Sequence, residues 1–225
     1  MNELTLIIPA KEESESLPIF LKEIEKYDYC KLVVLQKEDL ETKKSISNIK
    51  NIQIIEQKKN GYGNALKEGI GATKTKYCCI INADGSMDPK FLKNMLEICK
   101  DSDFVFASRY SSDGGSDDDN LVTFVGNKFF SFIGRFFFGL QISDILFTYI
   151  LGRSDAFKAL NLKYSDFRIC VEIPICVSKK SYKYKSVSSY ERSRIGGKKK
   201  VNAIRDGVLI LLAMIILFFK WKKKH

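Results

Sequence analysis

The side chains best suited to chemistry in this chain are oxygen ligands that follow one short apolar run. Residues 77–81 are continuously apolar rather than alternating, which predicts a strand covered on both faces. Asn82, Asp84 and Ser86 come directly after this strand. Carboxylates and small oxygen ligands suit Mg²⁺ or Mn²⁺, and these ions also bind diphosphate oxygens. The segment therefore predicts a divalent-metal site for a nucleotide-diphosphate ligand.

Three further segments have chemistry that suits the same ligand. Gly61 and Gly63 allow a backbone to approach closely and open a helix N-terminus, although their spacing is not that of a Walker loop. Arg109 places a guanidinium after the next predicted strand. Arg194 and Lys200 belong to a glycine- and lysine-rich loop that could close on phosphates.

The elements that must position these segments alternate between strand and helix. The predicted strands cover residues 4–8, 31–35, 53–56, 77–81 and 104–107, and the predicted helices cover residues 12–27, 64–72 and 89–100. Such alternation predicts an α/β domain with a mostly parallel central sheet flanked by helices. Ligands of these sheets bind beyond the carboxyl ends of the strands, which is where the polar segments lie.

The composition excludes several kinds of active site. The only histidine among the 225 residues is His225, so no Ser-His-Asp triad, Cys-His dyad or histidine-bound zinc fits the fold. The six cysteines include no Cys-x-x-Cys pair, which predicts reduced, mostly buried thiols in a cytosolic protein.

The charge and the apolar residues are concentrated at the C-terminus. Residues 190–225 carry 10 basic and 2 acidic residues, whereas residues 1–189 carry 27 and 25. Residues 207–219 form an uncharged apolar run, which as a helix is about 20 Å long against about 30 Å of hydrocarbon core. A basic tail around an apolar run predicts a membrane surface as the partner and no nucleic acid. We interpret the run as a membrane-embedded or interfacial helix; the alternative is a core or oligomerisation helix.

Two segments allow more than one interpretation. Residues 124–140 hold seven phenylalanines, interrupted by Lys128 and Arg135, and form either core or an amphipathic element in a membrane interface. Residues 111–120 include three successive aspartates. Because these lack the spacing of an EF-hand, we interpret the segment as a solvated loop rather than a calcium site.

Taken together, the motifs resemble the family-2 glycosyltransferases, and within them the polyprenol-phosphate (dolichol-phosphate) mannosyl- and glucosyltransferases. The matching segments, in chain order, are 7–13, 61–69, 82–89, 108–110, Asp144 nine residues before Arg153, 167–172 and 190–200. Three positions depart from the family pattern. Leu35-Gln36 replaces an acidic cluster, Asn82 replaces the first aspartate of Asp-x-Asp, and Lys199 replaces a serine.

The resemblance implies a GT-A fold over residues 1–206, followed by a membrane-associated segment over residues 207–225. It implies that Glu13 contacts the nucleoside. The other residues it assigns to the donor are Pro9, Gly61, Gly63 and Lys200.

The resemblance also implies the catalytic roles. Asp84, helped by Asn82 and Ser86, would hold Mg²⁺ or Mn²⁺, and Arg194 with the metal would neutralise the leaving diphosphate. Arg109 would hold a donor or acceptor phosphate. Asp144 would be the base if the acceptor were a hydroxyl.

The function that the resemblance implies is transfer of a sugar, with inversion, from a nucleotide-diphospho-sugar to a polyprenyl phosphate at the cytoplasmic face of a membrane. One alternative is a family-2 enzyme that acts on a saccharide or glycolipid hydroxyl in the synthesis of cell-envelope polysaccharide. Another is a catalytically degenerate protein that binds a nucleotide sugar or a partner enzyme.

Overall fold

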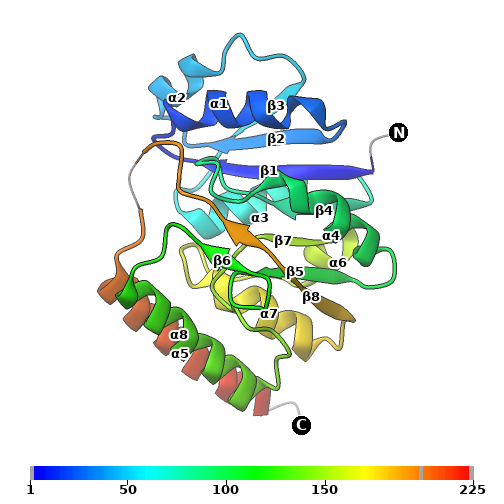
Figure 1. Cartoon of the computed structure of the whole chain (residues 1–225), viewed down its shortest axis with the longest axis vertical. Helices are drawn as coiled ribbons and strands as arrows, with labels where there is room; N and C mark the ends of the chain where they lie inside the picture. The colour runs from blue at the N-terminus through cyan, green and yellow to red at the C-terminus, as the bar shows by residue number, and fades with distance from the viewer. Residues whose placement is uncertain (1–2, 198–199, 223–225) are drawn as a thin grey trace.

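A seven-stranded sheet runs through the molecule in the order β3-β2-β1-β4-β7-β5-β8 (Figure 1). The computed structural model describes residues 3–197 and 200–222. The strands are β1 (Leu4–Ala10), β2 (Cys30–Leu35), β3 (Ile52–Glu56), β4 (Tyr77–Ile80), β5 (Phe104–Ser108), β7 (Ile150–Arg153) and β8 (Tyr184–Ser188). Only β7 is antiparallel to its neighbours, β4 and β5. The predicted α/β fold with a mostly parallel sheet is therefore confirmed.

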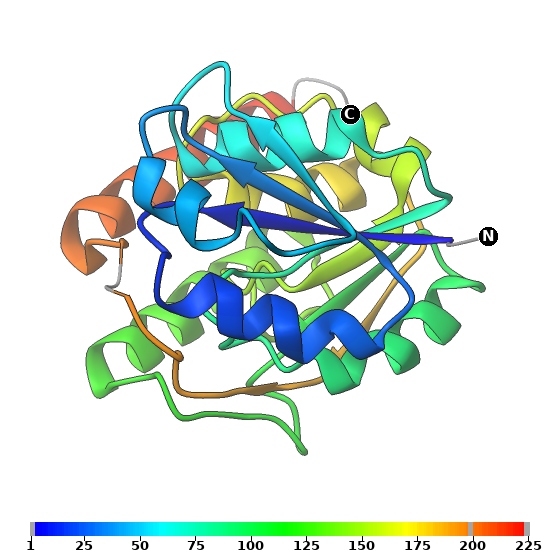
Figure 2. The same cartoon turned by 90° about the horizontal axis from the view of Figure 1, so that it is seen from above.

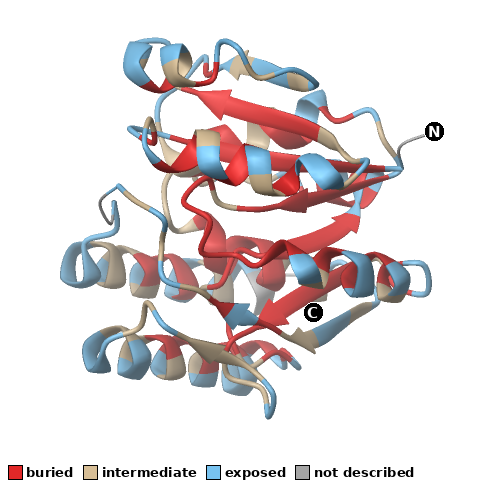
Figure 3. Ribbon diagram, turned by 45° about the horizontal axis from the view of Figure 1, so that its top comes forward, coloured by how far each residue is buried: buried red, intermediate tan, exposed pale blue. Residues whose placement is uncertain are grey.

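Helices cover both faces of this sheet. They are α1 (Ser16–Glu23), α2 (Leu40–Ser45), α3 (Tyr62–Ala72), α4 (Leu92–Cys99), α6 (Ser154–Ala159) and α7 (Ile169–Lys179). Figure 2 shows α1 and α4 on one face and α3 and α7 on the other. Alternate strand residues point to opposite faces, so Leu6 and Ile8 pack with α1 while Ile7 packs with α3. The inner strands are buried along their length (Figure 3).

The apolar pattern located most elements of the first half but not the short polar ones. The helix predicted over residues 12–27 is α1 followed by a 3₁₀ turn, η1 (Ile24–Lys26). A second such turn, η2 (Pro89–Phe91), opens α4. The sequence of α2 is Leu-Glu-Thr-Lys-Lys-Ser, which has no apolar stripe, so the pattern did not predict this helix.

Two long helices form an outer layer below the sheet in Figure 1. Helix α5 (Leu121–Phe138) starts with a capping box between Asn120 and Thr123 and ends at Gly139, whose φ of 64° favours glycine. Helix α8 (Ala203–Lys222) begins before residue 206. The boundary that we predicted between residues 1–206 and the membrane-associated segment therefore falls inside this helix. Ile210, Ala213 and Met214 of α8 are buried in the same core cluster as α7. The predicted apolar tail therefore packs on the domain.

The two helices run in parallel, and each has one exposed apolar stripe. The ring centroids of Phe137 and Phe218 lie 5.6 Å apart near the two C-termini. The exposed stripes have the same 4-3-4 spacing in both helices: Val125, Phe129, Phe132 and Phe136 in α5, and Val208, Leu212, Ile215 and Phe219 in α8. We call these eight residues the apolar face.

One side of α5 is core and the other is exposed, so the core interpretation holds for one side of the helix and the membrane interface stays a prediction for the other. Among the described residues, α5 is the helix that has the length and composition to cross a membrane, with a mean hydropathy of 1.2. It lies in mid-chain, whereas we predicted the membrane-associated helix at the C-terminus. The end of the predicted lysine tail, residues 223–225, lies outside the described residues.

Candidate active site

A cavity of about 640 Å³ lies at the carboxyl ends of β1 and β4. It is lined by most of the residues predicted to bind the donor or the metal, namely Pro9, Glu13, Gly61, Asn82, Asp84, Arg194 and Lys200. The first strand and the fourth strand are neighbours in the sheet, so their following segments meet at one edge. The structure therefore brings together residues that are up to 191 positions apart in the chain.

Asp84 is oriented by the residue two positions later. Its Oδ1 accepts hydrogen bonds from the Ser86 backbone N at 3.0 Å and from Ser86 Oγ at 2.7 Å. Ser86 itself is only 2% exposed. Its hydroxyl therefore positions the Asp84 carboxylate, and Oδ2 of Asp84 is the oxygen left for a ligand.

Arg194 faces that second oxygen. Its Nη1 lies 3.6 Å from Asp84 Oδ2, and its Nη2 lies 3.2 Å from Asp118 Oδ2. The loop is tied down on both sides of this residue, because the Ile195 N donates to Asp84 O at 2.8 Å and the Arg192 N donates to Ser86 O at 2.8 Å. The cationic loop thus closes directly on the Asp84 segment, and its predicted closure on phosphates stays a prediction. Lys198 and Lys199 of this loop lie outside the described residues.

Glu13 is held at the far side of the cavity by two helices. Its backbone N donates to Thr42 Oγ1 of α2 at 2.9 Å, and its Oε2 accepts from Ser16 Oγ of α1 at 2.5 Å. Lys200 Nζ lies 3.7 Å from Glu13 Oε1. Burial raises the pKa of Glu13, while the Ser16 bond and Lys200 act in the opposite direction. Ser16, the first residue of α1, therefore orients the Glu13 carboxylate.

Gly61 and Gly63 pack against the chain's own backbone. A Cβ on Gly63 would lie 2.6 Å from Tyr164 O, and one on Gly61 would lie 2.3 Å from Ser165 O. Glu172 holds this turn, since its carboxylate accepts from the Lys163 and Tyr164 backbone N at 2.8 and 3.0 Å. The close approach that we predicted for a phosphate is thus made by the 163–165 turn. Gly61 still lines the cavity, whereas Gly63 does not.

Arg109 and Asp144 form a buried, two-point ion pair. Arg109 Nε and Nη2 lie 2.7 and 2.9 Å from the two Asp144 oxygens. A third contact joins Arg109 Nη1 to Glu191 Oε2 at 2.9 Å. Burial lowers the pKa of Arg109, but Asp144 and Glu191 more than offset this and hold the pKa well above its usual value. Asp144 is 1% exposed, so the geometry favours a structural pair over the free phosphate ligand and free base that we expected.

A second cavity, of about 390 Å³, adjoins the first and lies between α5, α8 and the sheet. The two cavities share Tyr62, Asn82, Phe167, Arg194 and Lys200 in their walls. Tyr62 stacks on Phe167 with ring centroids 5.0 Å apart, and its hydroxyl lies 2.7 Å from Thr148 Oγ1. Asn82 receives only a long bond, 3.4 Å, from the Tyr62 hydroxyl.

The motifs missed several residues of these walls. Asp118 and Asp206 line the cavities, but we interpreted the first as part of a solvated loop and the second as part of the tail boundary. The pairing of β6 (Gly115–Ser116) with β9 (Tyr190–Glu191) carries the aspartate loop to the cationic loop. No local pattern predicts a pair of two-residue strands that are 75 positions apart.

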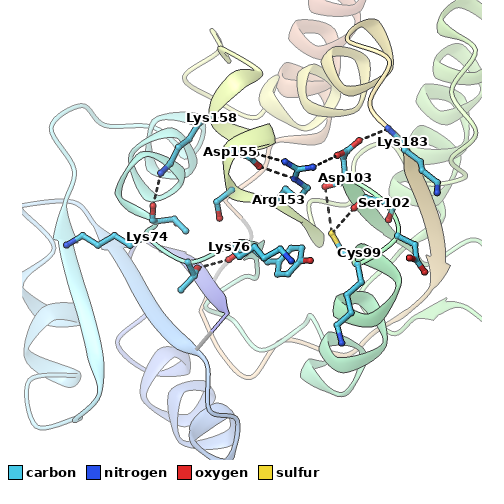
Figure 4. Close-up of a pocket in the computed structure, with 15 residues that line it drawn as sticks. Lys74, Lys76, Cys99, Ser102, Asp103, Arg153, Asp155, Lys158 and Lys183 are labelled. Atoms are coloured by element: carbon cyan, nitrogen blue, oxygen red, sulfur yellow. Dashed lines mark hydrogen bonds and ion pairs between the residues drawn. The ribbon is translucent and has the colours of Figure 1, made fainter. Parts of the chain in front are cut away.

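A third cavity, of about 830 Å³, lies at the opposite end of the sheet (Figure 4). Its labelled charged side chains are mostly basic, and several are held by other residues of the wall. Arg153 pairs with Asp103 and Asp155, and Lys158 Nζ donates to Thr73 O at 2.7 Å. Since this cavity adjoins the starts of the parallel strands, it is not the site that the fold predicts.

The chemistry of the first cavity fits a divalent metal that also takes ligands from a diphosphate. In the part of the chain that the structure describes, no three His, Cys, Asp or Glu residues are grouped so as to hold a metal by themselves. Asp84 Oδ2 supplies one oriented anionic oxygen, and Asn82 supplies an amide oxygen at the same strand end. The remaining ligands would have to come from the donor, as Mg²⁺ sites commonly allow.

The fold and this site define a GT-A-type nucleotide-binding α/β protein. Residues 5–160 match the sequence model of the family described as Glycosyl transferase family 2. The match covers more than half of the chain, so the chain belongs to this family. The predicted resemblance is thereby confirmed at the level of the family.

Curated relatives match about half of the chain. An uncharacterized glycosyltransferase of Mycobacterium tuberculosis and one of Mycobacterium bovis are each 32% identical over 109 residues. These alignments cover 48% of this chain and 49% of the relative, so the chain spans about half the length of the curated relatives it matches.

Solved structures share the fold at low sequence identity. Glucosyl-3-phosphoglycerate synthase from Mycobacterium tuberculosis, in complex with Mn²⁺, UDP and glucosyl-3-phosphoglycerate, has a TM-score of 0.74 and 11% identity, covering 96% of this chain and 80% of that one. Mannosyl-3-phosphoglycerate synthase from Rubrobacter xylanophilus has a TM-score of 0.68 and 14% identity, covering 99% and 74%. Bound Mn²⁺ in the first of these is consistent with the predicted divalent cofactor.

Proposed function

We propose that this protein transfers a sugar from a nucleotide-diphospho-sugar to a polyprenyl phosphate, with inversion, at the cytoplasmic face of a membrane. Family membership supports the transfer and the class of donor. The observation that supports a polyprenyl phosphate as the acceptor is the second cavity, which opens from Asn82 and Arg194 toward α5 and α8. A polyprenyl chain could leave this cavity along the apolar face, and a soluble saccharide would use none of that surface.

The donor would occupy the first cavity. Glu13 would accept a hydrogen bond from the nucleoside, and Arg194 and Lys200 would stabilise the diphosphate. A Mg²⁺ or Mn²⁺ held by Asp84 and Asn82 would supply further positive charge for the departing nucleoside diphosphate. In the transfer, an acceptor oxygen bonds to the anomeric carbon as the bond to the diphosphate oxygen breaks with its electron pair. Arg194 stabilises the charge that develops on that oxygen.

The pairing of the carboxylates favours an acceptor that is already anionic. The described acidic residues in the wall of the second cavity all have partners: Asp118 with Arg194, Asp119 with the Tyr110 hydroxyl, Glu191 with Arg109, and Asp206 with the Asn202 backbone N. Asp144 is buried behind Arg109. A hydroxyl acceptor needs a base, whereas a lipid phosphate is ionised at pH 7 and needs little such help.

The apolar face supports location at a membrane. Eight large apolar side chains are exposed along two neighbouring helices, and exposed apolar surface of this kind often marks a membrane or protein interaction site. The lysines from Lys220 onward follow the exposed stripe of α8 and would meet anionic headgroups. Both features fit helices that lie in the interface with the active site beside them.

A labelled-sugar assay tests the acceptor. It compares polyprenyl phosphate, the dephosphorylated alcohol, soluble oligosaccharides and 3-phosphoglycerate, the last because of the activity named for the similar solved structures. We expect label in polyprenyl phosphate alone. Label in an oligosaccharide or in 3-phosphoglycerate would overturn the acceptor while leaving the family activity intact.

A second experiment tests the membrane surface. Phe136→Ser with Phe129→Ser changes only exposed side chains, so we expect the fold and slow donor hydrolysis to persist while transfer to the lipid and flotation with anionic vesicles fall. The matched control is Ile54→Ser, an exposed apolar residue on β3. Equal loss in the control, or unchanged flotation in the double variant, would contradict the proposal.

A further inference from the structure

Two carboxylates from distant segments share one arginine in the first cavity. Asp84 follows β4, and Asp118 belongs to the loop that precedes α5, yet both face the Arg194 guanidinium at 3.6 and 3.2 Å. The β6–β9 pairing fixes this approach, and the Asp117 backbone N extends it by donating to Glu191 O at 2.8 Å. The backbone pairing therefore brings Asp118 close to Arg194, and the approach does not depend on one side-chain rotamer.

The contacts between Arg194 and the two carboxylates are long for an arginine that lies between two acidic side chains. The 3.6 Å contact with Asp84 is longer than a hydrogen bond. Arg194 Nε is buried and has no acceptor among the described residues. By contrast, Arg109 makes two bonds to Asp144 at 2.7 and 2.9 Å. Arg194 can thus leave this position at a lower cost than Arg109 can leave its own.

The other aspartates of the loop are engaged elsewhere. Asp117 Oδ1 accepts from the Tyr190 hydroxyl at 2.5 Å, and Asp119 accepts from the Tyr110 hydroxyl. Asp113 is exposed, and its carboxylate accepts a hydrogen bond from Ser112 Oγ at 3.3 Å. Asp118 is the member of the loop that reaches the side of Asp84.

Charge and ligand chemistry then indicate a divalent ion. Asp84 Oδ1 already accepts two hydrogen bonds from Ser86, so Oδ2 is its oxygen that faces Arg194, and the Asp118 carboxylate faces the same guanidinium. Carboxylate oxygens that converge in this way are the ligands that hard divalent cations prefer. The neutral Asn82 leaves the Asn-x-Asp segment one negative charge short, and Asp118 restores that charge.

We propose that Asp118 is a second carboxylate ligand of the divalent metal, and that Arg194 is the counter-charge that occupies the space between Asp84 and Asp118 until metal and donor bind. Arg194 then turns to the diphosphate. This inference rests on the proposed function, because it assigns a further ligand to the same site.

Mn²⁺ binding to the full chain tests this assignment without turnover. Free Mn²⁺ is measured by electron paramagnetic resonance, with Mn²⁺ alone and with Mn²⁺ plus UDP. We expect Asp118→Asn to weaken Mn²⁺ binding about 10-fold or more, and the control Asp113→Asn to change it less than about 2-fold. Arg194→Gln should tighten the binding of Mn²⁺ alone, because a competing cation is removed.

The double variant separates a ligand from a mere partner of Arg194. If Asp118 binds the metal, Asp118→Asn still weakens Mn²⁺ binding when Arg194 is already Gln. If Asp118 only holds Arg194, the effect vanishes in that background, which overturns the inference. An unchanged affinity in Asp118→Asn, or an equal loss in Asp113→Asn, overturns it as well. Loss of Mn²⁺ binding in Asp84→Asn shows that the metal site itself stands. No change in Asp84→Asn means instead that the proposed function fails at its metal site.

Discussion

Two arginine–carboxylate pairs lie at the same edge of the sheet, and they differ in almost every physical respect. Arg109 and Asp144 are 8% and 1% exposed and make a two-point contact. The side chains of Arg194 and Asp84 are 23% and 11% exposed and meet at 3.6 Å. In sequence both arginines were candidates for phosphate binding. Burial and geometry make the first pair a support for the site and the second a pair that can open.

The difference follows from the surroundings of each arginine. Arg109 lies between Asp144, Glu191 and the ring of Phe147, whose centroid is 4.6 Å away, so it is largely buried although it lines part of the second cavity. A buried charge of this kind cannot lose its partner without a large penalty. Arg194 comes from a loop, lines both cavities and has an Nε without an acceptor in the part of the chain that the structure describes, which are features of a group that acts on a ligand.

The largest expected effect is at Asp84. Asp84→Ala removes the oriented oxygen on which metal binding depends, so sugar transfer should fall about 1000-fold or more, since a metal at a developing charge contributes several kcal/mol. Thermal unfolding should shift little. Sugar transfer is measured from initial rates with excess donor and Mn²⁺. Thermal unfolding is measured by circular dichroism. Near-normal turnover would refute the site assignment, whereas Asn82→Asp is expected to tighten Mn²⁺ binding.

The buried pair should matter for stability instead. Asp144→Asn leaves the Arg109 charge without its main partner, and we expect the free energy of unfolding to fall by about 3–5 kcal/mol. The control is Asp155→Asn, which breaks the exposed pair with Arg153 and should cost less than about 1 kcal/mol. Urea denaturation measures both. Equally small losses in the free energy of unfolding of the two variants would show that the buried contact between Arg109 and Asp144 contributes no more to stability than the exposed pair does.

A comparison of Arg194 in the loop with Arg205 in α8 sharpens the contrast further. Arg194→Ala should reduce turnover about 100-fold with little change in stability, because its loose contacts contribute little to folding but its charge stabilises the leaving diphosphate. Arg205→Ala, at an exposed residue in the wall of the same cavity, should have a far smaller effect. The ratio of the two kcat values is the measurement, and similar values would contradict a specific role for Arg194.

The smallest effect concerns the pH dependence of stability. Burial raises the pKa of Glu13 above its usual value of 4.5, so the folded chain holds this proton more tightly than the unfolded chain. The Glu13 contribution to stability is therefore fully present below pH 4.5 and is lost as the pH rises through the folded pKa. The Glu13→Gln variant should lack this decline in stability. The urea midpoint of the wild-type protein should therefore fall relative to that of the variant from pH 4 to pH 7. A wild-type midpoint that rises relative to that of the variant would contradict the direction of the pKa shift.

The sequence determined the family, the sheet and the position of the metal motif by itself. Continuous apolar runs such as residues 77–81 predict buried strands, because a sheet covered on both faces admits no polar alternation. Local chemistry placed Asp84 at a strand end and Arg194 in a closing loop. These features depend on residues close together in the chain, and the structure agrees with them.

The tertiary structure alone decided which partners these residues meet. Gly61 and Gly63 approach the 163–165 turn rather than an open space, and Asp118 reaches Arg194 through a two-residue strand pair. The apolar run after residue 206 became the larger part of helix α8, which packs on the domain. Such contacts join segments about 75 to 100 positions apart. They are set by packing and burial, which no local spacing encodes.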